Sequence, residues 1–207
     1  MNRRRLAAAV AVLALSPPLT HARRIPPVAF EAEDFAQVRY ASGTNDEGVR
    51  SLTARVSRWA DAAAAEEFRQ FVLAGAGSDL PQGEFYQSEP EALALPGDFG
   101  EVSVTASRWN TTVGVAAYRT EWVLLGLRHD TLVWDIRISG AAPGPLQDLA
   151  ASLAADLPSR SLGDDLFRLL PGVDEVPDVL VLDYRMSPDG TFNAEGTPIP
   201  EPTAVPN

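Results

Sequence analysis

Apolar and polar residues alternate along four stretches of the chain, which is the pattern of β-strands half buried in a sheet. The third stretch carries apolar residues on both faces, and the polar segment 128–131 between the third and fourth stretches has the composition of a hairpin turn. The pattern therefore predicts four strands, of which the last two are joined directly. They are residues 49–59, 101–109, 114–127 and 132–138.

Two other stretches space their apolar residues three and four apart, as an amphipathic helix does. Residues 62–73 follow Asp61, a candidate N-cap, and carry an apolar stripe. Residues 145–157 begin at Pro145, a favourable first position for a helix, and carry a second stripe. The stripes are Ala64, Phe68, Phe71 and Val72 in the first helix, and Leu146, Leu149, Ala150 and Leu153 in the second.

The order strand–helix–strand–strand–strand–helix predicts an α+β fold, an antiparallel sheet with both helices packed on one face. Residues 162–170 add a short C-terminal helix, and residues 179–182 are candidates for an edge strand. The pattern assigns residues 28–40 to a short helix or turn, residues 80–99 to a connecting loop and residues 110–112 to a turn.

The first 22 residues have the three parts of a secretory signal peptide. A basic start, Arg3–Arg5, precedes ten apolar residues and a small-residue cleavage site ending at Ala22. Ten helical residues span roughly 15 Å, about half of a bilayer core, so we expect no stable membrane insertion after cleavage. The sequence therefore predicts a secreted or extracytoplasmic protein.

The composition of the remaining residues indicates three parts: a lead-in, a domain and a tail. We expect a mobile lead-in over residues 23–27, a single α+β domain over residues 28–185 and a disordered Pro-rich tail over residues 186–207.

Composition excludes several kinds of chemistry. The 207 residues contain no cysteine and, since all 17 basic residues are arginine, no lysine. Thiol nucleophiles, iron–sulfur clusters and Schiff bases are thereby excluded. The net charge of −11 disfavours nucleic acid as a partner. We expect no cofactor.

Few residues are suited to catalysis or metal binding. Signal cleavage would leave His129, in the predicted hairpin turn, as the only histidine, so a metal site with two histidines is excluded. The acidic residues around positions 164–178 lack the spacing of a calcium loop, and we expect no metal. Carboxylates are numerous enough that a paired-carboxylate hydrolase stays open.

Aromatic side chains are the remaining signal. Trp109, Tyr118 and Trp122 fall on two neighbouring predicted strands and would form an exposed patch if they faced away from the helices. The alternative is that they belong to the core. We predict these three residues as the ligand-binding surface.

Two stretches carry a resemblance to known proteins: residues 58–65, Arg-Trp-Ala-Asp-Ala-Ala-Ala-Ala, and residues 132–140, Leu-Val-Trp-Asp-Ile-Arg-Ile-Ser-Gly. They resemble stretches of uncharacterised secreted α+β proteins of high-GC bacteria, and the order of elements is similar to the PsbP-like fold of oxygen-evolving subunits and some actinobacterial lipoproteins. The resemblance implies a non-enzymatic extracytoplasmic module. Without a cysteine the chain has no lipobox, unlike the lipoproteins.

The sequence as a whole thus favours an exported, non-enzymatic binding module whose ligand or partner it does not name. The alternative from another class is a carboxylate-dependent hydrolase acting outside the membrane.

Overall fold

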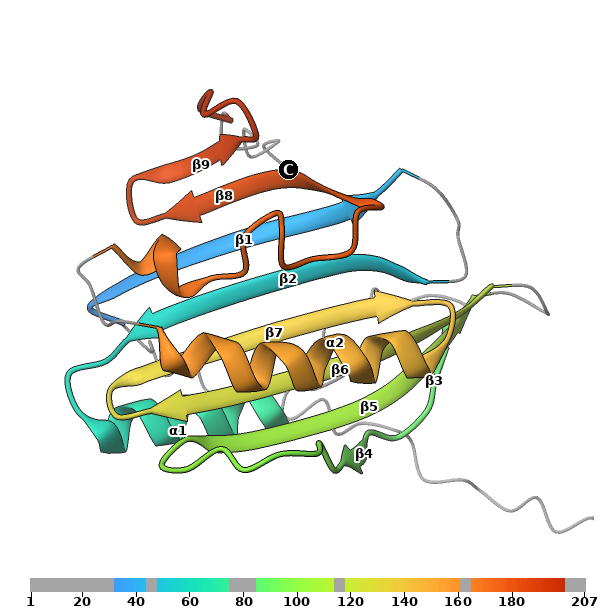
Figure 1. Cartoon of the computed structure of the whole chain (residues 1–207), viewed down its shortest axis with the longest axis horizontal. Helices are drawn as coiled ribbons and strands as arrows, with labels where there is room; N and C mark the ends of the chain where they lie inside the picture. The colour runs from blue at the N-terminus through green and yellow to red at the C-terminus, as the bar shows by residue number, and fades with distance from the viewer. Residues whose placement is uncertain (1–31, 44–47, 75–84, 114–117, 161–164, 200–207) are drawn as a thin grey trace, which may run out of the picture. The chain divides into compact units, whose positions relative to one another are not determined.

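A computed structural model describes residues 32–43, 48–74, 85–113, 118–160 and 165–199, and it has the predicted α+β class (Figure 1). The elements in chain order are β1 (Asp34–Ser42), β2 (Val49–Arg58), α1 (Ala62–Ala74), β3 (Phe85–Gln87), β4 (Glu91–Leu93), β5 (Ser103–Val113), β6 (Tyr118–His129), β7 (Leu132–Gly140), α2 (Pro143–Asp156), the 3-10 turns η1 (Leu157–Ser159) and η2 (Leu166–Leu169), β8 (Leu180–Ser187) and β9 (Gly190–Asn193).

The strands form one nine-stranded antiparallel sheet in the order β3-β5-β6-β7-β2-β1-β8-β9, with β4 pairing beside β3 on the outer side of β5. The β6–β7 hairpin closes over a two-residue turn, Asp130-Thr131, in which Asp130 has a φ of 54°. An aspartate tolerates this left-handed conformation better than most residues, which explains the turn at the predicted place.

The prediction that both helices pack on one face is wrong, because α1 and α2 cover opposite faces of the sheet. A Cβ added at Gly126 of β6 would lie 3.3 Å from Leu73 of α1. One added at Gly140 of β7 would lie 2.6 Å from Leu146 of α2. Gly140 pairs with Glu121, five residues from Gly126 along β6, and so projects to the other side. In Figure 1, α2 lies in front of the sheet and α1 behind it.

The main hydrophobic core lies on the α2 side. Strands β1, β2, β6 and β7 send their alternate apolar residues to this side, where α2, η1, η2 and the segment before β8 cover them. Trp134 is fully buried here and donates its indole N–H to the carbonyl of Leu169 at 3.0 Å. Tyr40 is also buried, and its hydroxyl donates to the carbonyl of Pro171 at 2.8 Å. These two bonds attach the segment after α2 to the sheet.

Helix α1 begins where the sequence predicts. The Asp61 carboxylate accepts the backbone N–H groups of Ala63 and Ala64, at 2.9 and 2.8 Å, and so satisfies two donors that a helix start leaves open. On its inner face, Phe68 stacks on Trp59 with ring centroids 4.5 Å apart. Neither α1 nor α2 is long and apolar enough to cross a membrane, and no other described helix is.

Several other predictions differ from the structure. Residues 34–42 form strand β1 rather than a helix, because they pair with β2 over their length. The predicted loop 80–99 contains β3 and β4, and the predicted turn 110–112 lies inside β5, where β3 and β6 pair with it.

The C-terminal part of the chain also differs. Of the predicted helix 162–170 only the turn Leu166–Leu169 forms, capped by Asp165, while residues 161–164 lie outside the described residues. The predicted edge strand is longer, Leu180–Ser187, and it pairs with β9 around Gly190. Hydrogen bonds from this hairpin therefore order part of the predicted disordered tail, through Ile199. Residues 1–31 and 200–207, which include the predicted leader and lead-in, lie outside the described residues.

Candidate functional site

The two predicted tryptophans are direct cross-strand partners on β5 and β6. Trp109 pairs with Trp122, and their rings stack almost parallel, with centroids 6.1 Å apart and an angle of 5° between the planes. The Trp122 indole N–H donates to the hydroxyl of Thr111 at 3.0 Å. Such a pair stabilises the two strands by about 0.5–1 kcal/mol beyond the area that it buries.

The structure thus brings together two of the three predicted site residues. Both tryptophans project to the α1 side of the sheet, as Gly126 does. Trp122 and Gly126 are an even number of residues apart on β6, and Trp109 pairs directly with Trp122, so all three point to the same face. Trp109 is only 7% exposed, whereas Trp122 is half-buried. The backbone of Tyr118 pairs with Val113, but its side chain lies outside the described residues. Of the two described rings, Trp122 therefore offers a ligand the larger surface.

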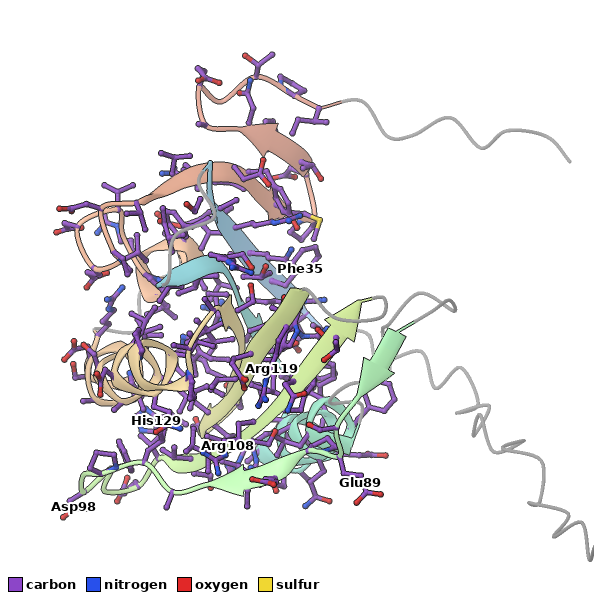
Figure 2. The ribbon with its side chains drawn as sticks, turned by 90° about the vertical axis from the view of Figure 1, so that its right-hand side faces the viewer. Phe35, Glu89, Asp98, Arg108, Arg119 and His129 are labelled. Atoms are coloured by element: carbon purple, nitrogen blue, oxygen red, sulfur yellow. The ribbon has the colours of Figure 1, made fainter. Side chains whose placement is uncertain are left out.

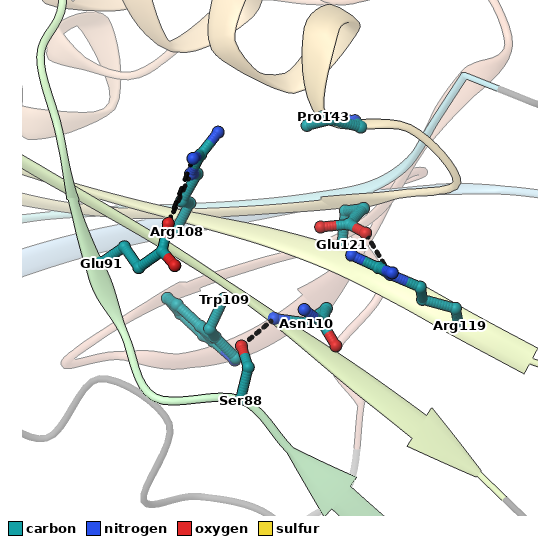
Figure 3. Close-up of a pocket in the computed structure, with 8 residues that line it drawn as sticks. All are labelled: Ser88, Glu91, Arg108, Trp109, Asn110, Arg119, Glu121 and Pro143. Carbon is teal, nitrogen blue, oxygen red and sulfur yellow. Dashed lines mark hydrogen bonds and ion pairs between the residues drawn. The ribbon is translucent and has the colours of Figure 1, made fainter.

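A polar pocket lies at the same end of β5 and β6, and its charged side chains are on the α2 side (Figure 3). Its volume is about 260 Å³. Strand alternation sends Arg108 and Asn110 of β5 to the side opposite Trp109. The lining residues are Ser88, Glu91, Arg108, Trp109, Asn110, Arg119, Glu121 and Pro143.

Two ion pairs set the electrostatics of this pocket. Arg108 donates from Nη2 to Glu91 Oε2 at 3.1 Å, joining β5 to β4. Arg119 donates from Nε to Glu121 Oε1 at 2.6 Å, two residues apart on one face of β6. The Arg119 side chain is 64% exposed, but that of Glu121 only 12%. The pocket thus offers an inner carboxylate, held by an outer guanidinium that remains accessible.

The segment between β3 and β4 forms one wall of the pocket. Ser88 makes two hydrogen bonds with Asn110 of β5, donating its backbone N–H to the carbonyl and accepting the backbone N–H on its Oγ, both at 3.0 Å. The Ser88 hydroxyl therefore has a structural partner, and no histidine is among the lining residues to activate it as a nucleophile. The groups present are suited to binding a polar ligand.

The other sequence candidates lie elsewhere. His129 is the last residue of β6, at the opposite end of this strand from Arg119, and its half-buried ring keeps Nδ1 without a hydrogen-bond partner (Figure 2). In the acidic stretch after α2, Glu175 accepts the Gly172 N–H at 2.6 Å and pairs with Arg160. These bonds hold the pKa of Glu175 below its ordinary value although burial opposes them. Within the described residues no three of the side chains His, Cys, Asp and Glu cluster as metal ligands.

Sequence reasoning missed the charged residues of the pocket. Arg108, Arg119 and Glu91 carry no motif, and Glu121 reads as an ordinary solvated strand residue. The one available signal was the two-residue spacing of Arg119 and Glu121, which places both side chains on the same face of a strand. The pairing of Glu91 with Arg108 was hidden, since the segment that contains β4 reads as a loop.

No family model matches this chain, and no curated protein matches it. One solved structure matches, that of a protein of unknown function from Pseudomonas aeruginosa, with 14% sequence identity over 68% of this chain and 90% of that one. Its TM-score of 0.29 carries no argument about fold or function.

Proposed function

We propose that this protein is an exported, non-enzymatic binding module whose ligand contacts the β5–β6 end of the sheet. The observation that carries the proposal is the pocket of about 260 Å³ that holds two guanidiniums and two carboxylates. The same two strands carry the tryptophan stack on their other side. The proposed ligand site is therefore the pocket with Arg108, Arg119 and Glu121. The predicted residues Trp109 and Trp122 lie on the opposite face of the same strands, where they can contact only a partner on the α1 side.

The arrangement of charges favours binding of a small polar molecule. Alternating guanidiniums and carboxylates offer both donors and acceptors to a ligand, as sugars and zwitterions require. Both carboxylates are already engaged by arginines, so neither is placed as an unengaged acid or base toward a substrate.

The experiment is a titration with defined probes, glycine as a zwitterion and glucose as a neutral sugar, followed by tryptophan fluorescence. We expect a saturable change with at least one probe and its loss in Arg119→Ala. Arg168→Ala is the matched control, because Arg168 is 84% exposed, lies in η2 outside the pocket and pairs with nearby Asp165. Equal responses from the two variants, or no saturable response to either probe, would count against the pocket.

The hydrolase alternative has one observation in its favour, the presence of Glu91 and Glu121 in one pocket. Glycoside hydrolysis needs two carboxyl groups about 5–9.5 Å apart. The test is release of nitrophenol from chromogenic glycosides, with Glu121→Gln compared with Glu195→Gln outside the pocket. On the binding proposal we expect no turnover by the wild-type protein, whereas turnover lost only in Glu121→Gln would establish the hydrolase.

Export is part of the proposal and rests on the leader of residues 1–22. We expect the mature protein, collected from outside the cytoplasmic membrane of a bacterial host, to begin at Arg23. Intact-mass measurement decides this, since a mass that includes residues 1–22 would contradict cleavage.

A further inference from the structure

On the α1 side, the part of the sheet formed by β1, β2 and β7 carries two rows of polar side chains. Strand pairing places Gln37, Arg55 and Asp135 in one row, and the next row is Arg39, Thr53 and Arg137. Helix α1 packs on β6 and β7. No helix in the described part of the chain covers β1 or β2 on this side (Figure 1), and the side chains of Arg39 and Arg137 are 45% and 38% exposed.

Arg55 is the central residue of this face, and its guanidinium has no hydrogen-bond acceptor within the described residues. Its Cζ lies 4.5 Å from the ring centroid of Phe35, whose position on β1 is labelled in Figure 2. Its Nε is shielded from solvent yet unpaired. Burial lowers the pKa of Arg55, and the nearby Asp135 acts in the opposite direction. A charged group with five N–H donors is thus held in place without an acceptor.

The neighbouring acids are engaged by the arginines on either side. Asp183 lies 3.4 Å from Nε of Arg39, and Asp135 lies 3.5 Å from Nε of Arg137. Neither carboxylate is within ion-pair distance of Arg55. Among the described residues around Arg55, three guanidiniums therefore share two carboxylates, which leaves one excess positive charge in this group.

We propose that Arg55 anchors a second binding site, which takes the carboxylate of a small organic acid. One carboxylate would balance the excess charge, and its planar geometry fits two parallel N–H donors of a guanidinium. The Phe35 ring fixes one side of the guanidinium and offers an apolar surface to the carbon atoms of the acid. The Gln37 amide, which donates to the Tyr184 hydroxyl at 2.9 Å, borders the site. This site is independent of the pocket at the β5–β6 end.

The test follows the Arg55 Nε–H resonance by NMR while acetate is added, with chloride added at equal ionic strength as the reference. Because Nε is shielded from solvent, we expect its proton to exchange slowly enough to be observed. The proposal requires a saturable shift with acetate that chloride does not reproduce. A shift that is absent, linear or equal in chloride would overturn it.

Two variants test the assignment of this site to Arg55. Arg55→Gln removes the resonance, and we expect it to weaken acetate binding, followed at the backbone amides of Phe35 and Gln37, about tenfold or more. Arg168→Gln, at an exposed arginine on η2, is expected to leave it unchanged. Unchanged acetate binding in folded Arg55→Gln would overturn the proposal. If that variant does not fold, the wild-type titration against chloride decides alone.

Discussion

Glu66 shows at the scale of one residue how charges attach α1 to the sheet. Its carboxylate accepts hydrogen bonds from Arg69 and Gln70 on the same helix and from Arg128 of β6, at 2.5–3.0 Å. Arg69 also donates to the hydroxyl of Thr105 on β5 at 2.6 Å. The hydrogen bonds from Arg69, more than any other interaction, lower the pKa of Glu66 from 4.5 to about 2.

This pKa shift makes a prediction about acid stability. A carboxyl whose pKa is lower in the folded state stabilises the fold above its unfolded pKa, and the contribution is lost as the pH falls toward the folded pKa. We expect Glu66→Gln to lower the free energy of unfolding by roughly 1 kcal/mol at pH 7, allowing for solvent screening. The difference from wild type should shrink between pH 4.5 and about 2.

Urea unfolding at several pH values measures this difference. Glu67→Gln is the matched control, because the next residue is exposed and makes none of these bonds. A Glu66→Gln penalty that stays constant down to pH 2 would show that the ionised carboxylate contributes nothing to the attachment.

Two glycines give a second prediction at the residue scale. A Cβ at Gly140 would lie 2.5 Å from the Gly48 carbonyl oxygen and 2.6 Å from Leu146, so Gly140→Ala forces the β7–α2 junction apart. We expect a loss of about 1–3 kcal/mol in the free energy of unfolding. Gly144, in the first turn of α2, has nothing within 4 Å of such a Cβ, and Gly144→Ala should be neutral or stabilising by up to about 1 kcal/mol.

Thermal unfolding of the two variants separates the effect of the clash at Gly140 from the general effect of replacing glycine by alanine. Equal melting temperatures for Gly140→Ala and Gly144→Ala would mean that the backbone at Gly48 moves aside without cost.

At the scale of one element, α1 depends on its cap. Asp61→Ala removes the acceptor of two backbone N–H groups, and we expect it to cost about 1 kcal/mol, whereas Asp61→Asn should retain most of the stability. Chemical denaturation measures both. If alanine and asparagine prove equally stable, packing of Phe68 on Trp59 rather than the cap holds the start of the helix.

The tryptophans on the two faces of the sheet are expected to contribute differently to the stability of the whole molecule. Trp134 lies fully buried in the α2-side core with its indole N–H bonded, so Trp134→Ala should cost about 3–5 kcal/mol and threaten folding. Trp122 is half-buried on the α1 side, and we expect Trp122→Ala to leave the fold intact while weakening the binding of a partner on the α1 side of β5 and β6.

Circular dichroism and thermal unfolding of the two tryptophan variants provide the comparison. Unfolding of Trp122→Ala would assign that ring to packing alone and remove it from the proposed binding surface.

The whole-molecule arrangement also shows why one fold prediction was wrong. Residues 122–127 are apolar at nearly every position, which is typical of a strand buried on both faces. A helix on each face satisfies that run, and Gly126 leaves room for Leu73 of α1. In β1 and β2 the alternation is regular, with Gln37, Arg39, Thr53 and Arg55 between apolar residues, so only one face of these strands needs a cover.

The candidate sites also contain some residues that the sequence could identify and some contacts that it could not. The sequence could name Trp109 and Trp122 as aromatic residues on neighbouring strands, but their direct pairing depends on a register that the predicted turn at 110–112 does not give. The pair Glu91–Arg108 joins a predicted loop to a strand, and the pair Arg39–Asp183 joins a predicted helix or turn to the end of a predicted edge strand. Strands such as β4 and β1 form because they pair with a neighbouring strand. A local sequence pattern therefore does not predict the contacts that they make.

The sequence by itself determined what is local: the strand and helix periods, the Asp61 cap and the tight turn at Asp130. Each of these depends on residues within one or two turns of chain, where side-chain period and backbone preference act directly. Only the tertiary structure decided which face each helix covers, that β1, β3, β4 and β9 are strands, and that Arg55 has no hydrogen-bond acceptor among the described residues. Those features depend on hydrogen bonds and burial contributed by distant segments, which carry no mark in the sequence of the residues concerned.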